Sequence, residues 1–204
     1  MEFPERASKK ITDMISVYLD DASEEKLAVI NYGIAVFITN TYKMLLICIA
    51  AVILNIFKYF LAAFLSFGAL RTFAAGVHAK REWTCLPTSS LLFLGVAYAG
   101  KSIELSLLVT GIIFILCFIA VLKYAPADTE EHPIVSKKLR AKLKVMSSVT
   151  VIALYLFTIY NLNTGIASIV TLSTAFESVL ILPVAYKLLG SAYGAGININ
   201  KREV

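Results

Sequence analysis

The chain has 204 residues, of which 58% are hydrophobic and 16% charged, and its formal net charge is +5. A soluble domain carries about 25% charged residues and 45–50% apolar ones, so this composition excludes an ordinary water-soluble protein. It predicts one integral membrane domain over residues 1–204, an all-α bundle of transmembrane helices in a lipid bilayer, with no nucleic-acid partner.

The N-terminal segment, residues 1–26, is polar with a short apolar stripe. Ile11, Met14 and Ile15 recur at helical spacing within residues 8–19 and predict an amphipathic helix that is too short and too charged to span a membrane. We expect it to lie at the membrane interface, with packing against the spanning helices as the alternative. No small-residue cleavage site follows, so the first apolar spans are expected to act as uncleaved insertion signals.

Hydropathy then predicts six transmembrane helices. A span needs about 20 residues, at 1.5 Å each, to cross some 30 Å of hydrocarbon. The third run is short, which allows a tilted or re-entrant segment. The predicted spans lie at roughly 33–56, 59–75, 86–101, 105–123, 143–161 and 166–189.

The distribution of basic residues predicts the orientation. The most basic stretch follows a proline-bounded loop within residues 124–144, and the positive-inside rule places it in the cytoplasm. An even number of spans then puts both termini and residues 78–85 on the same cytoplasmic side. The basic residues of this stretch are Lys137, Lys138, Arg140, Lys142 and Lys144.

The three cysteines fall into two kinds of surroundings. Cys48 and Cys117 lie in apolar runs, where a thiol behaves as a small hydrophobic group, whereas Cys85 has polar neighbours. An odd count without regular spacing argues against a disulfide framework. His132 lacks a second histidine or a suitable cysteine nearby, so we expect a solvated loop histidine, no metal and no cofactor.

Residues 71–89 combine His78, a candidate base, with Cys85, a candidate nucleophile. Seven residues of straight helix rise about 10.5 Å, whereas a base must approach its nucleophile to about 3 Å. The pair therefore works only if the chain bends, and the polar residues 80–84 before Pro87 are a suitable break. The simpler alternative is an interfacial histidine beside an inert cysteine.

The same segment contains Arg71, which could bind a carboxylate or an oxyanion, and Gly76, which allows close backbone approach. A third group could orient His78. The sequence offers three carboxylates for that position and does not choose among them: Glu82, Asp128 and Glu130.

The pattern Arg71-x4-Gly76-x-His78-Ala79-x5-Cys85-x-Pro87-x-Ser89 resembles the signature of the accessory gene regulator B (AgrB) family. These are bacterial membrane cysteine endopeptidases that mature quorum-sensing peptides. The chain length, the amphipathic start and residues 124–129 followed by Pro133 are also similar to the family. The chain departs from it at Ala75, where many members have a second glycine, and this affects loop flexibility more than chemistry.

The resemblance implies a thiol protease in the bacterial cell membrane, with Cys85 as nucleophile and His78 as base. Its substrate would be an AgrD-like autoinducer pro-peptide. Cys85 would release the C-terminal tail and keep an acyl-thioester, which a cysteine or serine of the retained peptide converts to a thiolactone or lactone. Shaping the site or stabilising charge would fall to the remaining motif residues, Arg71, Gly76, Pro87 and Ser89. The family also makes a homodimer an option.

Two questions stay open at this point. The basic run 137–144 is either a topology determinant that contacts anionic lipid or a docking site for the acidic tail of the precursor. The rival function is a small transporter or channel, which ionisable residues inside spans would favour. Lys43, Glu177 and Lys187 are the candidates, but they form no evident proton path, and Glu177 is expected to pack with Ser173, Thr174 or Ser178. A scaffold without activity is the third reading.

Overall fold

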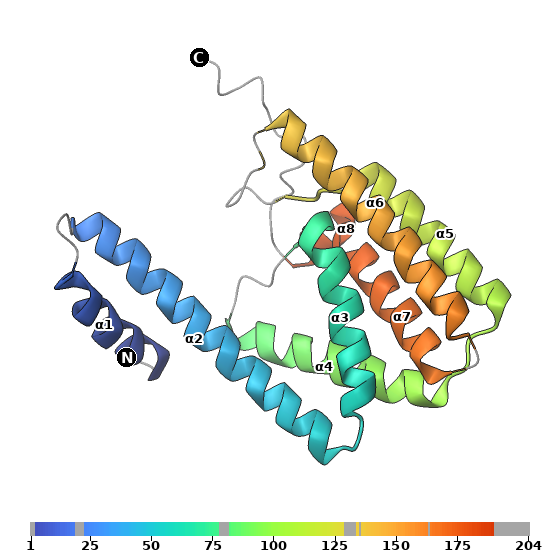
Figure 1. The fold of residues 1–204 in the computed structure, drawn as a ribbon, viewed down its shortest axis with the longest axis horizontal. Coiled ribbons are helices and arrows are strands. Elements are labelled where there is room, and N and C mark those ends of the chain that lie inside the picture. Colours follow the sequence, from blue (N-terminus) through green and yellow to red (C-terminus); the bar gives the residue numbers. More distant parts are fainter. Residues whose placement is uncertain are drawn as a thin grey trace. The chain divides into compact units, whose positions relative to one another are not determined.

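The computed structural model describes residues 3–18, 23–77, 82–128, 134, 136–162 and 164–189, with the backbone alone at 3, 82–89 and 91. In these residues the fold is entirely helical (Figure 1), which confirms the predicted class. The chain divides into two compact units, Met1–Ile53 and Leu54–Val204.

The first unit consists of α1 (Phe3–Ser16) and α2 (Glu24–Ile53), which pack against each other. Ser8 and Thr12 are the buried residues of α1, and the Thr12 hydroxyl donates to Asn31 of α2 at 3.4 Å. The apolar side chains Ile11 and Met14 stay exposed. The predicted amphipathic helix is therefore present, and its small polar side chains, rather than its apolar stripe, face α2.

Helix α2 has 30 residues, about 45 Å at the usual rise, and begins earlier than the predicted start at residue 33. Ser23 accepts a hydrogen bond from the amide of Lys26, so the polar first turn extends the apolar helix. The helix ends at Ile53, before a turn in which Asn55 has a φ of 54°. Asparagine tolerates this left-handed conformation better than most residues.

The second unit is built around one helix. It contains α3 (Phe57–Ala74), α4 (Glu82–Ser102), α5 (Leu107–Tyr124), α6 (Lys137–Tyr160), α7 (Gly165–Leu180) and α8 (Pro183–Leu188). Helix α7 contacts each of the other five and is buried along most of its length. The elements that carry the motif and the basic run are thereby held on a common scaffold.

The sequence of α7 explains how a helix with many polar residues is buried so deeply. The hydroxyls of Thr171, Thr174 and Ser178 donate to carbonyls four residues earlier, at 2.7–2.8 Å, so they need no outside partner. Small residues also let α4 approach closely, because a Cβ on Gly100 would collide with Ile169.

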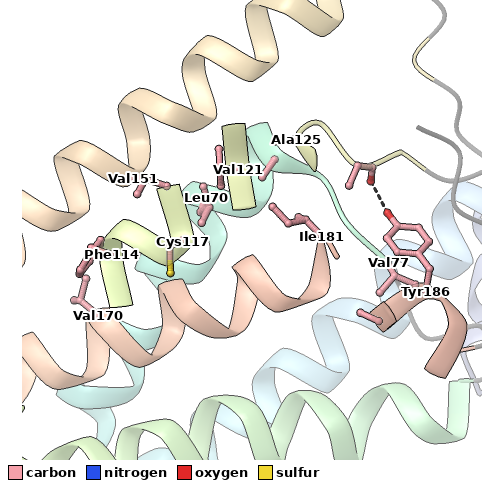
Figure 2. Close-up of a cluster of buried hydrophobic side chains, with 13 residues drawn as sticks. Leu70, Val77, Phe114, Cys117, Val121, Ala125, Val151, Val170, Ile181 and Tyr186 are labelled. Atoms are coloured by element: carbon pink, nitrogen blue, oxygen red, sulfur yellow. Dashed lines mark hydrogen bonds between the residues drawn. The ribbon is translucent and has the colours of Figure 1, made fainter. Parts of the chain in front are cut away.

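A hydrophobic core joins the helices on several sides of α7 (Figure 2). Leu70 of α3, Phe114 and Val121 of α5, and Val151 of α6 meet Val170 of α7 in one buried cluster. Cys117 belongs to this cluster, in keeping with its predicted role as a small hydrophobic residue. The core ends beside the segment that follows α3, because Val77 and Tyr186 are also members.

Three of the described helices, α2, α5 and α6, are long and apolar enough to cross a membrane. The chain is a membrane protein, while the number of six spans stays a prediction. The last predicted span, 166–189, is wrong as one helix, because α7 ends at Leu180 and α8 begins at Pro183. Leu182 is extended, and proline has no N–H with which to continue a helix.

Candidate active site

The chain turns directly after α3. Ala75 has φ 57° and ψ −144°, and Gly76 has φ 129°, so neither residue continues the helix. Helix α4 begins at Glu82, and Cys85 lies in its first turn. The turn therefore separates Arg71, on α3, from Cys85, on α4.

The predicted break at residues 80–84 is too long at its C-terminal end. Glu82, Trp83 and Thr84 already belong to α4. Pro87 lies in the second turn, where its missing N–H removes a single helical hydrogen bond and does not end the helix. His78 and the side chains of Cys85, Pro87 and Ser89 lie outside the described residues, as do Glu130 and the side chain of Glu82.

The backbone just before His78 is held by hydrogen bonds from two other parts of the chain. The amide of Gly76 donates to the carbonyl of Ala127, whose own amide donates to Ala74, both at 2.9 Å. Val77 donates to the carbonyl of Leu180, at the end of α7, at 3.3 Å. We call residues 75–77 the anchored segment.

The loop after α5 is secured from α8 as well. The Tyr186 hydroxyl donates to the carbonyl of Ala127 at 2.6 Å, which is the dashed contact in Figure 2. Ala127 therefore connects the anchored segment to α8. The pairing of this loop with the motif was not predicted from the sequence.

Arg71 fixes the anchored segment through its side chain. Its Nη1 donates to both carboxylate oxygens of Glu177 at 3.3 Å, and its Nη2 donates to the carbonyls of Gly76 at 3.1 Å and Val77 at 2.7 Å. The carboxylate that Arg71 binds thus belongs to the chain itself. Both terminal nitrogens of the guanidinium point at the protein's own oxygen atoms.

The prediction that Glu177 packs with nearby hydroxyls of α7 is wrong. The hydroxyls of Thr174 and Ser178 donate within their own helix, while the fully buried Glu177 forms an ion pair with Arg71. A buried carboxylate requires a compensating charge. The sequence contained a signal for this pair: Glu177 is the one acidic residue in the apolar run 166–189, and Arg71 is the one basic residue in the run 59–75.

Gly76 is required by geometry. A Cβ at this position would lie 2.5 Å from Nη1 of Arg71, and the φ of 129° is one that side-chain-bearing residues rarely adopt. Any larger residue would displace the arginine that holds the segment.

A second arginine organises the loop that pairs with the anchored segment. Nη2 of Arg140 lies 2.7 Å from Oδ2 of Asp128 and donates to the carbonyl of Ile134 at 3.3 Å, while Nη1 donates to Pro126 at 3.2 Å. The amide of Ile134 also donates to Oδ2 of Asp128, at 2.8 Å. Oδ1 of Asp128 is buried and has no hydrogen-bond partner in the part of the chain that the structure describes.

The five predicted docking residues are therefore not equivalent. Arg140 is engaged within the loop, whereas the side chains of Lys137, Lys138 and Lys142 are exposed and Lys144 is half-buried. The basic start of α6 thus contains one internal structural arginine and four lysines that remain candidates for binding.

Comparison with known proteins gives a consistent result. The family model for accessory gene regulator B matches residues 8–181. A putative AgrB-like protein of Clostridium acetobutylicum is 30% identical over 91% of this chain and 90% of its own length. The accessory gene regulator protein B of Staphylococcus aureus is 28% identical over 77% and 83%, respectively. No solved structure matches the chain. The chain belongs to the accessory gene regulator B family.

Proposed function

We propose that this protein is a membrane cysteine endopeptidase that cleaves an AgrD-like pro-peptide and promotes its cyclisation in bacterial quorum sensing. The observation that carries the proposal is the arrangement around the motif. Arg71, Ala127 and Leu180 hold the backbone up to Val77, the residue before His78, while Cys85 lies in the first turn of α4. A catalytic base needs a backbone that holds it in a defined position, because it must come within hydrogen-bond reach of its nucleophile.

In the first step His78 takes the proton of the Cys85 thiol, and the thiolate attacks a peptide carbonyl of the precursor. The C–N bond breaks, the tail leaves as an amine that takes the proton from the imidazolium, and Cys85 keeps the acyl group as a thioester. The first turn of a helix favours negative charge, so the place of Cys85 in α4 suits a thiolate.

In the second step a cysteine or serine of the retained peptide attacks the thioester. His78 takes the proton of the attacking thiol or hydroxyl, a new thioester or ester bond closes the ring, and the Cys85 thiolate leaves and recovers that proton. The thioester conserves the energy of the cleaved bond, so the reaction needs no nucleotide. Ring closure succeeds over hydrolysis when the site excludes water and keeps both peptide ends close.

Arg71 and Gly76 act as positioning residues in this proposal. The donors of Arg71 are directed to Glu177 and to two backbone carbonyls, which leaves bond-making to His78 and Cys85. Among the three carboxylates considered as partners of His78, Asp128 directly follows Ala127, whose carbonyl accepts a hydrogen bond from Gly76. Its Oδ1 atom has no hydrogen-bond partner in the described chain. These features favour Asp128 as the group that orients His78.

Docking of the precursor's acidic tail on the start of α6 also remains a proposal. Because Arg140 is engaged by Asp128, the lysines are the residues left to receive the tail. We further propose that the site faces the cytoplasm of a multi-pass protein, since the basic clusters at both termini and at 137–144 then all lie inside. A homodimer stays a prediction.

The transporter alternative depended on ionisable groups within spans. One of its three candidates, the buried Glu177, is paired with Arg71. An ion pair that also holds two backbone carbonyls has a sufficient structural reason to exist.

The test is processing of a candidate precursor in proteoliposomes, followed by mass spectrometry. Cys85→Ala and His78→Ala are each expected to lower the cleavage rate by at least about 10²-fold. Cys48→Ala, which removes a cysteine in an apolar helix, is the matched control and should cleave normally. If both motif variants still release the tail, the catalytic assignment is wrong.

A further inference from the structure

A cavity of about 570 Å³ lies where α5 ends and α6 begins. Lys123 and Tyr124 contribute to it from the last turn of α5, and Ala125 follows them. Three basic residues of α6 line the other side together with Ala141: Lys137, Arg140 and Lys144.

Within the described residues, no carboxylate pairs with the lysines that line this cavity. Arg140 is paired with Asp128, but Lys123, Lys137 and Lys144 form no ion pair within the described chain. Lys123 lies over the ring of Tyr124, with its ammonium 5.3 Å from the ring centre. Three ammonium groups around one cavity form a site for an anion.

The helical register of α6 separates the lysines into two pairs. Residues 137, 140, 141 and 144 recur at intervals of three and four, so they share the face that lines the cavity. Lys138 and Lys142 are turned about 100° or more around the helix axis from the centre of this face, and they do not line the cavity. The basic run therefore has a cavity pair, Lys137 and Lys144, and an outer pair, Lys138 and Lys142. Of the four lysines considered for docking the precursor's tail, only the outer pair stays available for it when the cavity holds another anion.

The surroundings of the cavity indicate where the anion comes from. Both α5 and α6 are long and apolar enough to cross a membrane, and their exposed side chains include Leu108, Ile115, Val149 and Leu156. The cavity lies at the polar ends of these two helices, beside a tyrosine, the kind of residue that gathers at headgroup depth. Basic pockets between such helices bind acidic lipid headgroups.

We propose that this cavity binds the headgroup of an anionic phospholipid, with Lys123, Lys137 and Lys144 contacting the phosphate. Ala125 and Ala141 leave room for the glycerol portion. Ala125 and Arg140 also flank the loop that pairs with the anchored segment, so an occupied cavity stabilises that loop.

The experiment measures lipid binding to the whole protein in zwitterionic detergent by native mass spectrometry, with phosphatidylglycerol and phosphatidylcholine as probes. Lys137→Gln with Lys144→Gln is compared with Lys138→Gln plus Lys142→Gln, which removes the same charge from the same helix. The loss of each cavity lysine is expected to weaken phosphatidylglycerol binding by about fivefold. The loss of both outer lysines is expected to weaken it by less than about twofold.

Lys123→Gln provides the decisive single variant because Lys123 lies outside the basic run. It should weaken phosphatidylglycerol binding about fivefold, whereas Lys101→Gln, at the end of α4, should not. Far-ultraviolet circular dichroism verifies that each variant keeps its helices.

Several results would overturn the proposal. One is an equal loss in the cavity and outer pairs, and another is equal binding of the two lipids. Binding of inorganic phosphate alone, or of a hexaglutamate peptide in place of the lipid, with the same dependence on Lys123 would assign the cavity to another ligand. Loss of cleavage in the motif variants has no bearing on this result, so the two proposals fail independently.

Discussion

Two arginines of this protein make the same set of contacts in different surroundings. Arg71 binds Glu177 and the carbonyls of residues 76 and 77, and Arg140 binds Asp128 and the carbonyls of residues 126 and 134. The two loops that they hold are paired with each other through Ala75 and Ala127. Each arginine thus fixes one of these two paired loops.

The two ion pairs differ in burial and in the sequence separation of their partners. Glu177 is fully buried and Arg71 is 15% exposed, while Arg140 is 28% exposed beside an Asp128 at 2%. The first pair joins residues 106 positions apart, and the second closes a loop of 12. The deeper pair holds two helices of the bundle together, whereas the shallower one orders a local loop.

The largest expected effect comes from breaking the deep pair. Glu177→Ala leaves the guanidinium of Arg71 without its counter-charge in a buried place and should lower the free energy of unfolding by about 3–5 kcal/mol. Unfolding by sodium dodecyl sulfate, followed by circular dichroism, measures this loss. Glu104→Ala removes an exposed carboxylate and should stay within about 0.5 kcal/mol of the wild type. Equal losses in both variants would contradict the structural role of the pair.

Breaking the shallow pair should cost less. Arg140→Gln removes the counter-charge of Asp128, but Asp128 keeps the amide of Ile134 as a donor and water reaches the arginine. We expect a loss of about 2 kcal/mol in the same unfolding experiment. Lys142→Gln, two residues along the same helix, should be neutral. A loss for Arg140→Gln that matches that of Glu177→Ala would show that burial does not set the contribution of the two pairs.

The smallest expected effect comes from changing the backbone conformation where the two loops pair. Ala75 has a positive φ that glycine adopts at lower cost, so Ala75→Gly should raise the free energy of unfolding by about 1 kcal/mol. Gly76→Ala should act in the opposite direction, since its Cβ would displace Arg71. If Ala75→Gly lowers stability, the positive φ of Ala75 is not a source of strain.

Local patterns were sufficient for several features of this chain. The helical spacing of Ile11 and Met14 predicted α1, and long apolar runs predicted α2, α5 and α6, because hydrophobic periodicity depends on neighbouring residues alone. The split of the last run at Pro183 was also readable in principle, since proline lacks the N–H that a helix needs. Hydropathy overlooked it by averaging over the whole run.

By itself, the sequence determined the membrane class, most of the helical elements and the residue types of the candidate site. Only the tertiary structure decided that Glu177 is the partner of Arg71 and that Ala127 pairs with Gly76. It also decided which lysines of α6 share a cavity with Lys123. The reason is physical: a buried charge or an unpaired backbone amide requires a partner, but its identity depends on which helices α7 brings together.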